Sequence, residues 1–366
     1  MKSPWFRLTL EERLQEVLAV HFDPVQGTKY WLEREKELGI DVRKEIKTLT
    51  DLAIFGPMDQ EALRQRPIEE LVPQGLLKHK EKLILGDTAG TTGPSKVAVY
   101  SEDEFYETFV EFFGYVAEKR NFPIGENWLW IGPSGPHIIG KAARLVAKRM
   151  GSCDPFAIDF DPRWVKKLLP ATMAWERYQQ HIVDQSLAIL SCQNIGVIFT
   201  TPPILEKISP MMTPETRERI KGVHYGGMAL ENILYQRFRE DYFPGAIHIS
   251  GYGNTLFGVC LELEDSPGYN LEYYPPGPRL ILNIVPLDQG RNLEQRLTEE
   301  VPYGQRGQVV FHRLDKSGLI LNMFERDSAV RIPPSEKAKR MGIFGDGIRN
   351  PQPIINDKDQ DQLGLY

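Results

Sequence analysis

The chain has 366 residues, of which 41% are hydrophobic and 26% charged, which are ordinary shares for a folded globular protein. Its length predicts one large domain with several parts, or two domains. The formal net charge of -6 argues against nucleic-acid or anionic-membrane binding, since both require a basic surface.

No apolar run is long enough to span a membrane, and the N-terminus lacks the apolar core of a signal peptide. We therefore expect a cytoplasmic protein. The three cysteines, Cys153, Cys192 and Cys260, are widely spaced in apolar stretches, so we expect them to be buried and reduced, and we assign no metal site to them.

Residues 1–80 are predicted to be a helical accessory segment. Apolar residues recur at helical spacing between Leu10 and Leu18, and Thr28 can cap a second helix that ends at Gly39.

Residues 81–258 predict an α/β fold, because short apolar runs alternate with amphipathic helices. Such alternation favours mainly parallel sheets covered by helices on both faces. Strands are expected at 83–85, 97–100, 128–131, 156–158, 197–200, 223–225 and 247–250, and helices at 101–119, 141–150, 173–190, 214–220 and 231–239.

Residues 259–332 contain apolar runs separated by Pro, Gly and Asp, which predict a small antiparallel β subdomain. The polar segment 333–366 shows little periodicity, and we interpret it as a residual hinge and tail.

The most informative stretch is Gly86 to Lys96, G-D-T-A-G-T-T-G-P-S-K, between two predicted strands. Glycines, threonine hydroxyls and a lysine are suited to cradling phosphate groups. The stretch is not a Walker loop, because it lacks G-K-[ST] after four spacer residues and a helix directly behind it.

Residues 88–96 resemble the T-S-G-T-T-G-x-P-K signature of the adenylate-forming superfamily, which contains acyl-CoA synthetases, peptide-synthetase adenylation domains and luciferases. Ala89 replaces the serine, and Pro94 and Ser95 are interchanged. Three further motifs follow in the order of that superfamily: Tyr225-Gly226-Gly227-Met228-Ala229-Leu230, Gly251-Tyr252-Gly253-Asn254-Thr255, and Glu325-Arg326-Asp327, the last similar to phenylacetate-CoA ligases.

The resemblance implies a fold like the large N-terminal domain of these enzymes, an ATP site and a catalytic set of Lys96, Thr255 and His137. Within it, Thr91, Thr92 and Lys96 would hold the leaving phosphates, Tyr252 and Gly227 the adenine, Thr255 the α-phosphate and Asp327 the ribose. The full set of ATP-binding residues that it implies is Thr88, Gly90, Thr91, Thr92, Gly93, Lys96, Gly226, Gly227, Tyr252, Gly253, Asn254, Thr255 and Asp327.

Two departures from the superfamily pattern bear on mechanism. Leu256 stands where relatives place a magnesium-binding glutamate, and leucine cannot ligate a hard cation. Mg²⁺ would then be held by phosphate and water, by Glu262 or Glu264, or poorly. Only a short segment follows Asp327, so we expect the C-terminal domain of relatives to be absent, as in the similarly sized adenylating protein of phenazine (griseoluteic acid) biosynthesis.

The acyl site is predicted beyond the strand ends, where His137, Tyr225, Gly227, Met228 and Tyr252 offer aromatic faces and close backbone approach. An aromatic carboxylic acid is the expected substrate, with a reductase, transferase or carrier protein as acceptor of the acyl group. The alternative is a non-catalytic protein that binds a nucleotide or an aromatic acid on a degenerate adenylating fold. A complete CoA ligase is less favoured, and the oligomeric state is left open.

Overall fold

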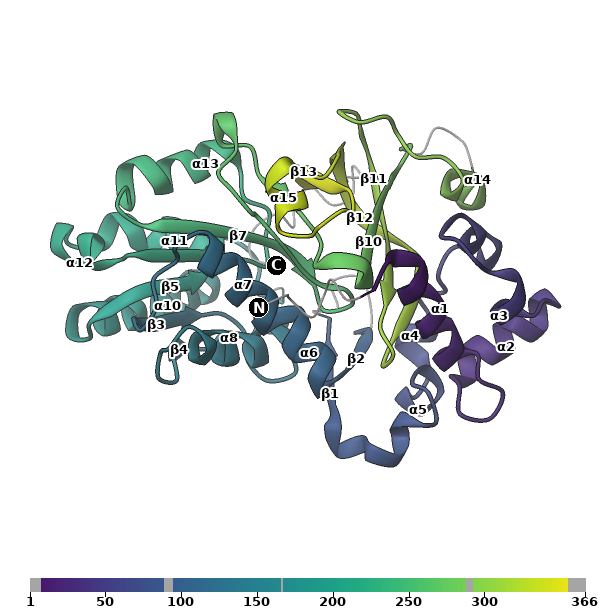
Figure 1. Cartoon of the computed structure of the whole chain (residues 1–366). Coiled ribbons are helices and arrows are strands. Elements are labelled where there is room, and N and C mark those ends of the chain that lie inside the picture. The colour runs from purple at the N-terminus through teal and green to yellow at the C-terminus, as the bar shows by residue number, and fades with distance from the viewer. Residues whose placement is uncertain (1–7, 89–94, 166, 288–291, 355–366) are drawn as a thin grey trace.

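The computed structural model describes residues 8–88, 95–165, 167–287 and 292–354, which form three β-sheets with helices between and around them (Figure 1). The N-terminal part is helical, as predicted. Its elements are α1 (Leu10–His21), α2 (Lys29–Leu38), α3 (Val42–Glu45), a 3-10 helix (Thr50–Phe55), α4 (Ala62–Gln65), α5 (Ile68–Leu71) and a second 3-10 helix (Leu76–Lys82).

The central sheet has six strands in the order β4-β3-β5-β6-β7-β8. Its first five strands pair in parallel, and β8 runs antiparallel to β7. Strand β5 is buried along its whole length, and its sequence is apolar up to the final Thr200 rather than alternating. The strands are β3 (Asn127–Ile131), β4 (Phe156–Ile158), β5 (Ile195–Thr200), β6 (Gly222–Tyr225), β7 (Ile247–Asn254) and β8 (Gly258–Leu261).

Helices cover both faces of this sheet. The chain moves from β3 outward to β4 through α8 and back to β5 through α10, so right-handed crossovers put these two helices on opposite faces. The helices are α6 (Glu102–Phe105), a π-helical segment (Tyr106–Glu111), α7 (Phe112–Lys119), α8 (Ile138–Arg149), α9 (Pro162–Val165), α10 (Met173–Cys192), α11 (Pro202–Ile208), a 3-10 turn (Ser209–Met211), α12 (Pro214–Arg219), α13 (Asn232–Arg237) and a second π-helical segment (Phe238–Tyr242).

Two antiparallel sheets complete the fold. The hairpin of β1 (Leu83–Asp87) and β2 (Val97–Ser101) carries the predicted phosphate loop. A five-stranded sheet has the order β10-β11-β12-β13-β9. Its elements are β9 (Glu272–Tyr273), β10 (Leu280–Val285), α14 (Leu293–Leu297), β11 (Arg306–Leu314), β12 (Leu319–Ile332), α15 (Glu336–Arg340) and β13 (Gly347–Pro353), with 3-10 turns at Pro267–Tyr269 and Gly277–Arg279.

A buried charged cluster holds the N-terminal helices to the five-stranded sheet. Asp315 is fully buried, and its carboxylate pairs with the guanidinium groups of Arg279 and Arg313. These arginines hold the pKa of Asp315 well below its usual range, although burial alone would raise it. On the α1 side, His21 is bonded to the Asp315 carbonyl oxygen at 2.9 Å.

The predicted α/β class with a separate antiparallel subdomain is confirmed, and three local expectations need correction. Helix α2 begins and ends as predicted, but the Thr28 hydroxyl bonds to Nδ1 of His21 at 2.6 Å instead of capping the helix. Cys153 and Cys192 are exposed, and only Cys260 is buried. Residues 347–353, within the segment that we interpreted as hinge and tail, form a strand of the five-stranded sheet. No helix in the described ranges is long and apolar enough to cross a membrane.

Candidate functional site

Four segments that are distant in sequence meet next to the β1–β2 hairpin. They are the ends of the phosphate loop, the turn that follows β7, the middle of β12 and the loop that follows β3. Direct hydrogen bonds between them define the candidate site, and each bond involves a residue of the predicted motifs or its neighbour.

The described ends of the phosphate loop are bonded to each other. The Thr88 amide donates to the Lys96 carbonyl oxygen, and the Lys96 amide donates to the Thr88 hydroxyl oxygen, both at 2.9 Å. The antiparallel pairing of β1 with β2 therefore continues to the base of the loop. The predicted phosphate-binding residues Gly90, Thr91, Thr92 and Gly93 lie outside the described residues.

The Lys96 side chain is half-buried and points toward the N-terminal part of the chain. Its Nζ donates to Oε1 of Gln60 at 2.6 Å. Burial lowers the pKa of Lys96, while the nearby Glu325 carboxylate raises it. An ammonium group with one neutral partner retains donors for an anion such as phosphate.

The turn after β7 is tied to both β1 and β12. The Thr255 hydroxyl donates to the Asp87 carbonyl oxygen at 3.3 Å, and the Tyr100 hydroxyl donates to the Thr255 carbonyl oxygen at 2.9 Å. Asn254 accepts hydrogen bonds from two following backbone amides, which shapes the turn, and its Nδ2 donates to Oε1 of Glu325 at 2.6 Å.

Tyr252 and Asp327, which the sequence assigns to adenine and ribose, are in direct contact. The Tyr252 hydroxyl donates to Oδ2 of Asp327 at 3.0 Å. Burial raises the pKa of both side chains, and this hydrogen bond opposes the increase for Asp327. Burial also raises the pKa of Glu325 to about 7, with a further increase from Asp327. Two half-buried carboxyl groups and one half-buried lysine therefore lie near one another.

His137 lies at the start of α8, and its loop is anchored beside the hairpin. The Asp87 amide donates to the Pro136 carbonyl oxygen at 2.9 Å, and Ser134 donates to the Asp159 carboxylate through both its amide and its hydroxyl. His137 is 8% exposed, and burial together with the nearby Arg163 lowers its pKa. The carboxylates of Asp161, Asp87 and Asp159 act in the opposite direction.

The segment from Tyr225 to Met228 has a different environment. The Tyr225 ring is buried, stacks on Phe238 at 5.6 Å between centroids, and its hydroxyl bonds to His248. Gly226 donates its amide to the Thr200 carbonyl oxygen at 3.2 Å, Gly227 has a positive φ of 83°, and Met228 is half-buried. The structure thus places the Tyr225 side chain in the core beside the sheet.

The alternative magnesium ligands lie elsewhere. Leu256 is 2% exposed in the core. Glu262 is fully buried, where its carboxylate accepts from the Tyr235 hydroxyl and pairs with Arg120, and Glu264 accepts from Ser335. The Glu262 amide donates to the carbonyl oxygen of Ser250 in β7. Ser250 comes five residues before Thr255, so Glu262 lies beside an earlier part of this chain segment than Thr255. In the described parts of the chain, no three His, Cys, Asp or Glu side chains are grouped as a metal site.

Sequence reasoning missed three residues of this site. Gln60 comes from the helical accessory segment, and no motif marks it. Glu325 was noted only as part of a motif. Asp87, within the phosphate-loop stretch, pairs through its carboxylate with Arg163 of α9 at 3.0 Å.

Comparison with solved structures shows that this arrangement of sheets is the fold of the large N-terminal domain of adenylate-forming acyl-CoA ligases. The chain is similar to 2-hydroxyisobutyryl-CoA ligase in complex with 2-HIB-AMP and CoA in the thioesterification state, with a TM-score of 0.65 and 15% identity over 94% of this chain and 66% of that one. An open conformation of that ligase with 2-HIB-AMP and CoA gives a TM-score of 0.67 and 14% identity over 92% and 71%. No family model and no curated protein sequence matches the chain.

At this level of identity the likeness establishes the fold alone. The chain spans about two thirds of the length of the ligase that it matches. The fold expected from the adenylate-forming resemblance is therefore confirmed, while substrate and reaction have to be argued from the site.

Proposed function

We propose that this protein uses ATP to activate an aromatic carboxylic acid as an acyl-adenylate, with release of pyrophosphate. The observation that carries the proposal is the convergence of Lys96, Tyr252 and Asp327: Tyr252 bonds to Asp327, Asn254 bonds to Glu325, and Lys96 lies near Glu325, so three separate motifs of the sequence lie together. The likeness in fold to a ligase that has been determined with an acyl-adenylate supports the same class of reaction.

The donor set fits a nucleotide. Lys96 and the threonines of the loop would hold the departing phosphates, Thr255 the α-phosphate and Asp327 the ribose hydroxyls, which a carboxylate accepts well. In the reaction the acid's carboxylate oxygen attacks the α-phosphorus, and the bond to pyrophosphate breaks. No protein nucleophile is required, because positioning and charge neutralisation supply the rate enhancement.

Magnesium bound with ATP would neutralise phosphate charge. Since Leu256 is buried and Glu262 is paired with Arg120, the carboxylate of this site that suits a hard cation is Glu325. The remaining ligands would be phosphate oxygens and water.

The acid is proposed to bind between His137, the 225–229 segment and Tyr252, with Gly227 and Met228 on the open side. Because the Tyr225 side chain is buried, it would hold the end of β6 in place and would not contact the acid itself. A planar aromatic ring, with a phenazine-type acid as the specific candidate, suits aromatic faces and glycine backbone better than a long flexible chain. A reductase, a transferase or a carrier protein would take the acyl group.

One observation favours a second candidate function, a non-catalytic protein that binds a nucleotide or an aromatic acid. The core position of Leu256 removes a carboxylate that catalysis would use. Such a protein would bind ATP through the same residues without forming acyl-AMP.

Pyrophosphate exchange into ATP, measured against a panel of aromatic and aliphatic acids with Mg²⁺, tests the proposal. We expect exchange that depends on an aromatic acid. ATP binding in calorimetry without exchange for any acid would favour the binding protein, and a preference for long aliphatic acids would contradict the proposed acyl site.

A further inference from the structure

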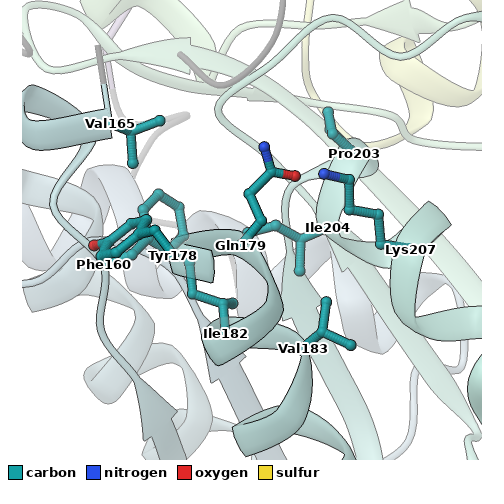
Figure 2. Close-up of a pocket in the computed structure, with 9 residues that line it drawn as sticks. All are labelled: Phe160, Val165, Tyr178, Gln179, Ile182, Val183, Pro203, Ile204 and Lys207. Atoms are coloured by element: carbon teal, nitrogen blue, oxygen red, sulfur yellow. The ribbon is translucent and has the colours of Figure 1, made fainter. Parts of the chain in front are cut away.

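A cavity lies between α10 and α11, beyond the carboxyl ends of β4 and β5 (Figure 2). The space inside it that the centre of a water molecule can reach is about 20 Å³, and the volume rises to about 360 Å³ only when its opening to solvent is counted as well. The wall is mostly apolar and includes Phe160, Val165, Ile182 and Ile204. None of the residues that line it belongs to the candidate nucleotide site, so the cavity is a separate feature of the fold.

Gln179 of α10 is the unusual member of the lining. The residue is 7% exposed, and neither Oε1 nor Nε2 has a hydrogen-bond partner. Figure 2 shows its carboxamide extending between Val165 on one side and Pro203 and Lys207 on the other. In the described part of the chain no other buried carboxamide lacks partners in this way. Burying an amide without hydrogen-bond partners costs free energy. A ligand that enters the cavity and bonds to the Gln179 carboxamide would remove this cost.

Lys207 of α11 supplies a charge at the rim. Its Nζ lies 5.0 Å from the centroid of the Trp175 ring. The adjacent acid, Glu206, pairs with Arg237 instead, and among the described residues Lys207 has no ion-pair partner. The hydroxyl of Tyr178, also in the lining, already accepts from the Asp161 amide at 2.9 Å. The Tyr178 hydroxyl keeps its own proton to donate, so Gln179, Lys207 and Tyr178 are the polar groups available to an occupant.

We propose that this cavity binds a small carboxylate with a compact apolar body. The carboxylate would accept from the Lys207 ammonium and from Nε2 of Gln179, while the apolar body would lie against Phe160, Ile182 and Ile204. Water, or a hydroxyl of the ligand, would donate to Oε1. This inference is independent of the proposed adenylation, because it uses none of the same residues.

Thermal unfolding of the full chain with isobutyrate or benzoate, at ionic strength matched with NaCl, tests the proposal. We expect a rise in Tm that benzamide, the uncharged analogue of benzoate, does not produce. Lys207→Met and Gln179→Leu should each lose at least half of that rise. Lys119→Met is the matched control, since the Lys119 ammonium also lies over an aromatic ring, that of Tyr115, at 5.7 Å, but Lys119 does not line this cavity.

Two further measurements locate the ligand. In spectra of protein labelled at isoleucine methyl groups, Ile182 and Ile204 should shift on addition of isobutyrate. His137→Gln should leave the rise in Tm intact. The proposal is overturned if neither carboxylate raises Tm above the NaCl control, or if both cavity variants keep the full rise. It is also overturned if only His137→Gln removes the rise, because the acid would then occupy the proposed acyl site.

Discussion

The side-chain contacts of Lys96 suit the phosphate-binding role that is proposed for it. Its ammonium has a neutral partner, Gln60, and faces the Glu325 carboxylate, so it can move to an incoming phosphate without breaking a close ion pair. Partial burial strengthens any charge-assisted bond that it forms there.

We predict that Lys96→Ala weakens ATP binding by about 1.5 to 3 kcal/mol, the usual contribution of a hydrogen bond to a charged group. Calorimetric titration with ATP measures the change. Lys148→Ala is a suitable control, because Lys148 is exposed and pairs with Asp154 on the surface. Equal ATP affinity for the two variants would remove Lys96 from the nucleotide site.

At this scale the sequence could predict residues that sit in motifs, but not their partners. Lys96, Tyr252 and Asp327 were identified because motif order places them in one site. Gln60 and Glu325 could not be assigned, because their roles depend on contacts across the fold. Whether the motif residues bind ATP and the acid stays a prediction, since the loop residues 89–94 lie outside the described part.

Among the elements, the β7–β8 hairpin controls the position of Tyr252 and Thr255. Gly253 pairs with Val259 across the hairpin, and a Cβ at Gly253 would lie 2.1 Å from the Gly258 carbonyl oxygen. The two strands could not keep this separation with any larger residue. Packing alone therefore favours glycine at position 253, in addition to its place in the predicted nucleotide motif.

We predict that Gly253→Ala lowers the free energy of unfolding by about 1 to 3 kcal/mol, as overpacking does, and also weakens ATP binding. Urea unfolding and calorimetry measure the two effects. Gly245→Ala is the control, because a Cβ there meets no heavy atom within 4 Å and its φ is not positive. If Gly253→Ala were as stable as Gly245→Ala, the hairpin would be less tightly packed than described.

The five parallel strands of the central sheet could be predicted because their apolar runs are short and bounded by turn residues, whereas no strand was predicted at β8. Strand β13 could not, since residues 347–353 are polar and its partners, β12 and β9, lie at different points of the sequence. The same holds for Thr28, whose hydroxyl is taken by His21 from α1 rather than by its own helix. The local sequence pattern predicts whether a segment forms a helix or a strand, whereas the partners of that segment depend on the tertiary fold.

Among the described residues of the whole molecule, five histidines are buried, and four of them, His21, His224, His248 and His312, have strongly lowered pKa values. Burial lowers the pKa of each to about 4, from 6.5. Unfolding would return each pKa to its ordinary value, so below pH 6.5 the unfolded chain binds protons that the folded chain excludes. Stability contributed by the neutral histidines is therefore complete above pH 6.5 and is lost as pH falls toward 4.

Buried carboxyl groups act in the opposite direction over part of that range. Burial raises the pKa of Glu262 and Glu325 from 4.5 to about 7, so the folded chain binds protons at these sites more readily than the unfolded chain. Their contribution is present at low pH and is lost as pH rises through 7. Between pH 5.5 and pH 7.5 the buried histidines and these glutamates therefore change the stability in opposite directions.

His312 allows the histidine contribution to be isolated. Burial is the cause of its lowered pKa, and its Nδ1 accepts from the Asn322 amide at 3.2 Å, which fixes the neutral form. We predict that His312→Gln, which keeps an acceptor but cannot titrate, loses about 1 kcal/mol less stability than the wild type between pH 7.5 and pH 5.5. Urea unfolding at both pH values measures this difference.

His181→Gln is the control, because His181 is exposed on α10 and should give the wild-type dependence. If His312→Gln and the wild type had the same pH dependence, His312 would be able to accept a proton in the folded protein, and the contribution of buried histidines to acid sensitivity would have to lie with the other three.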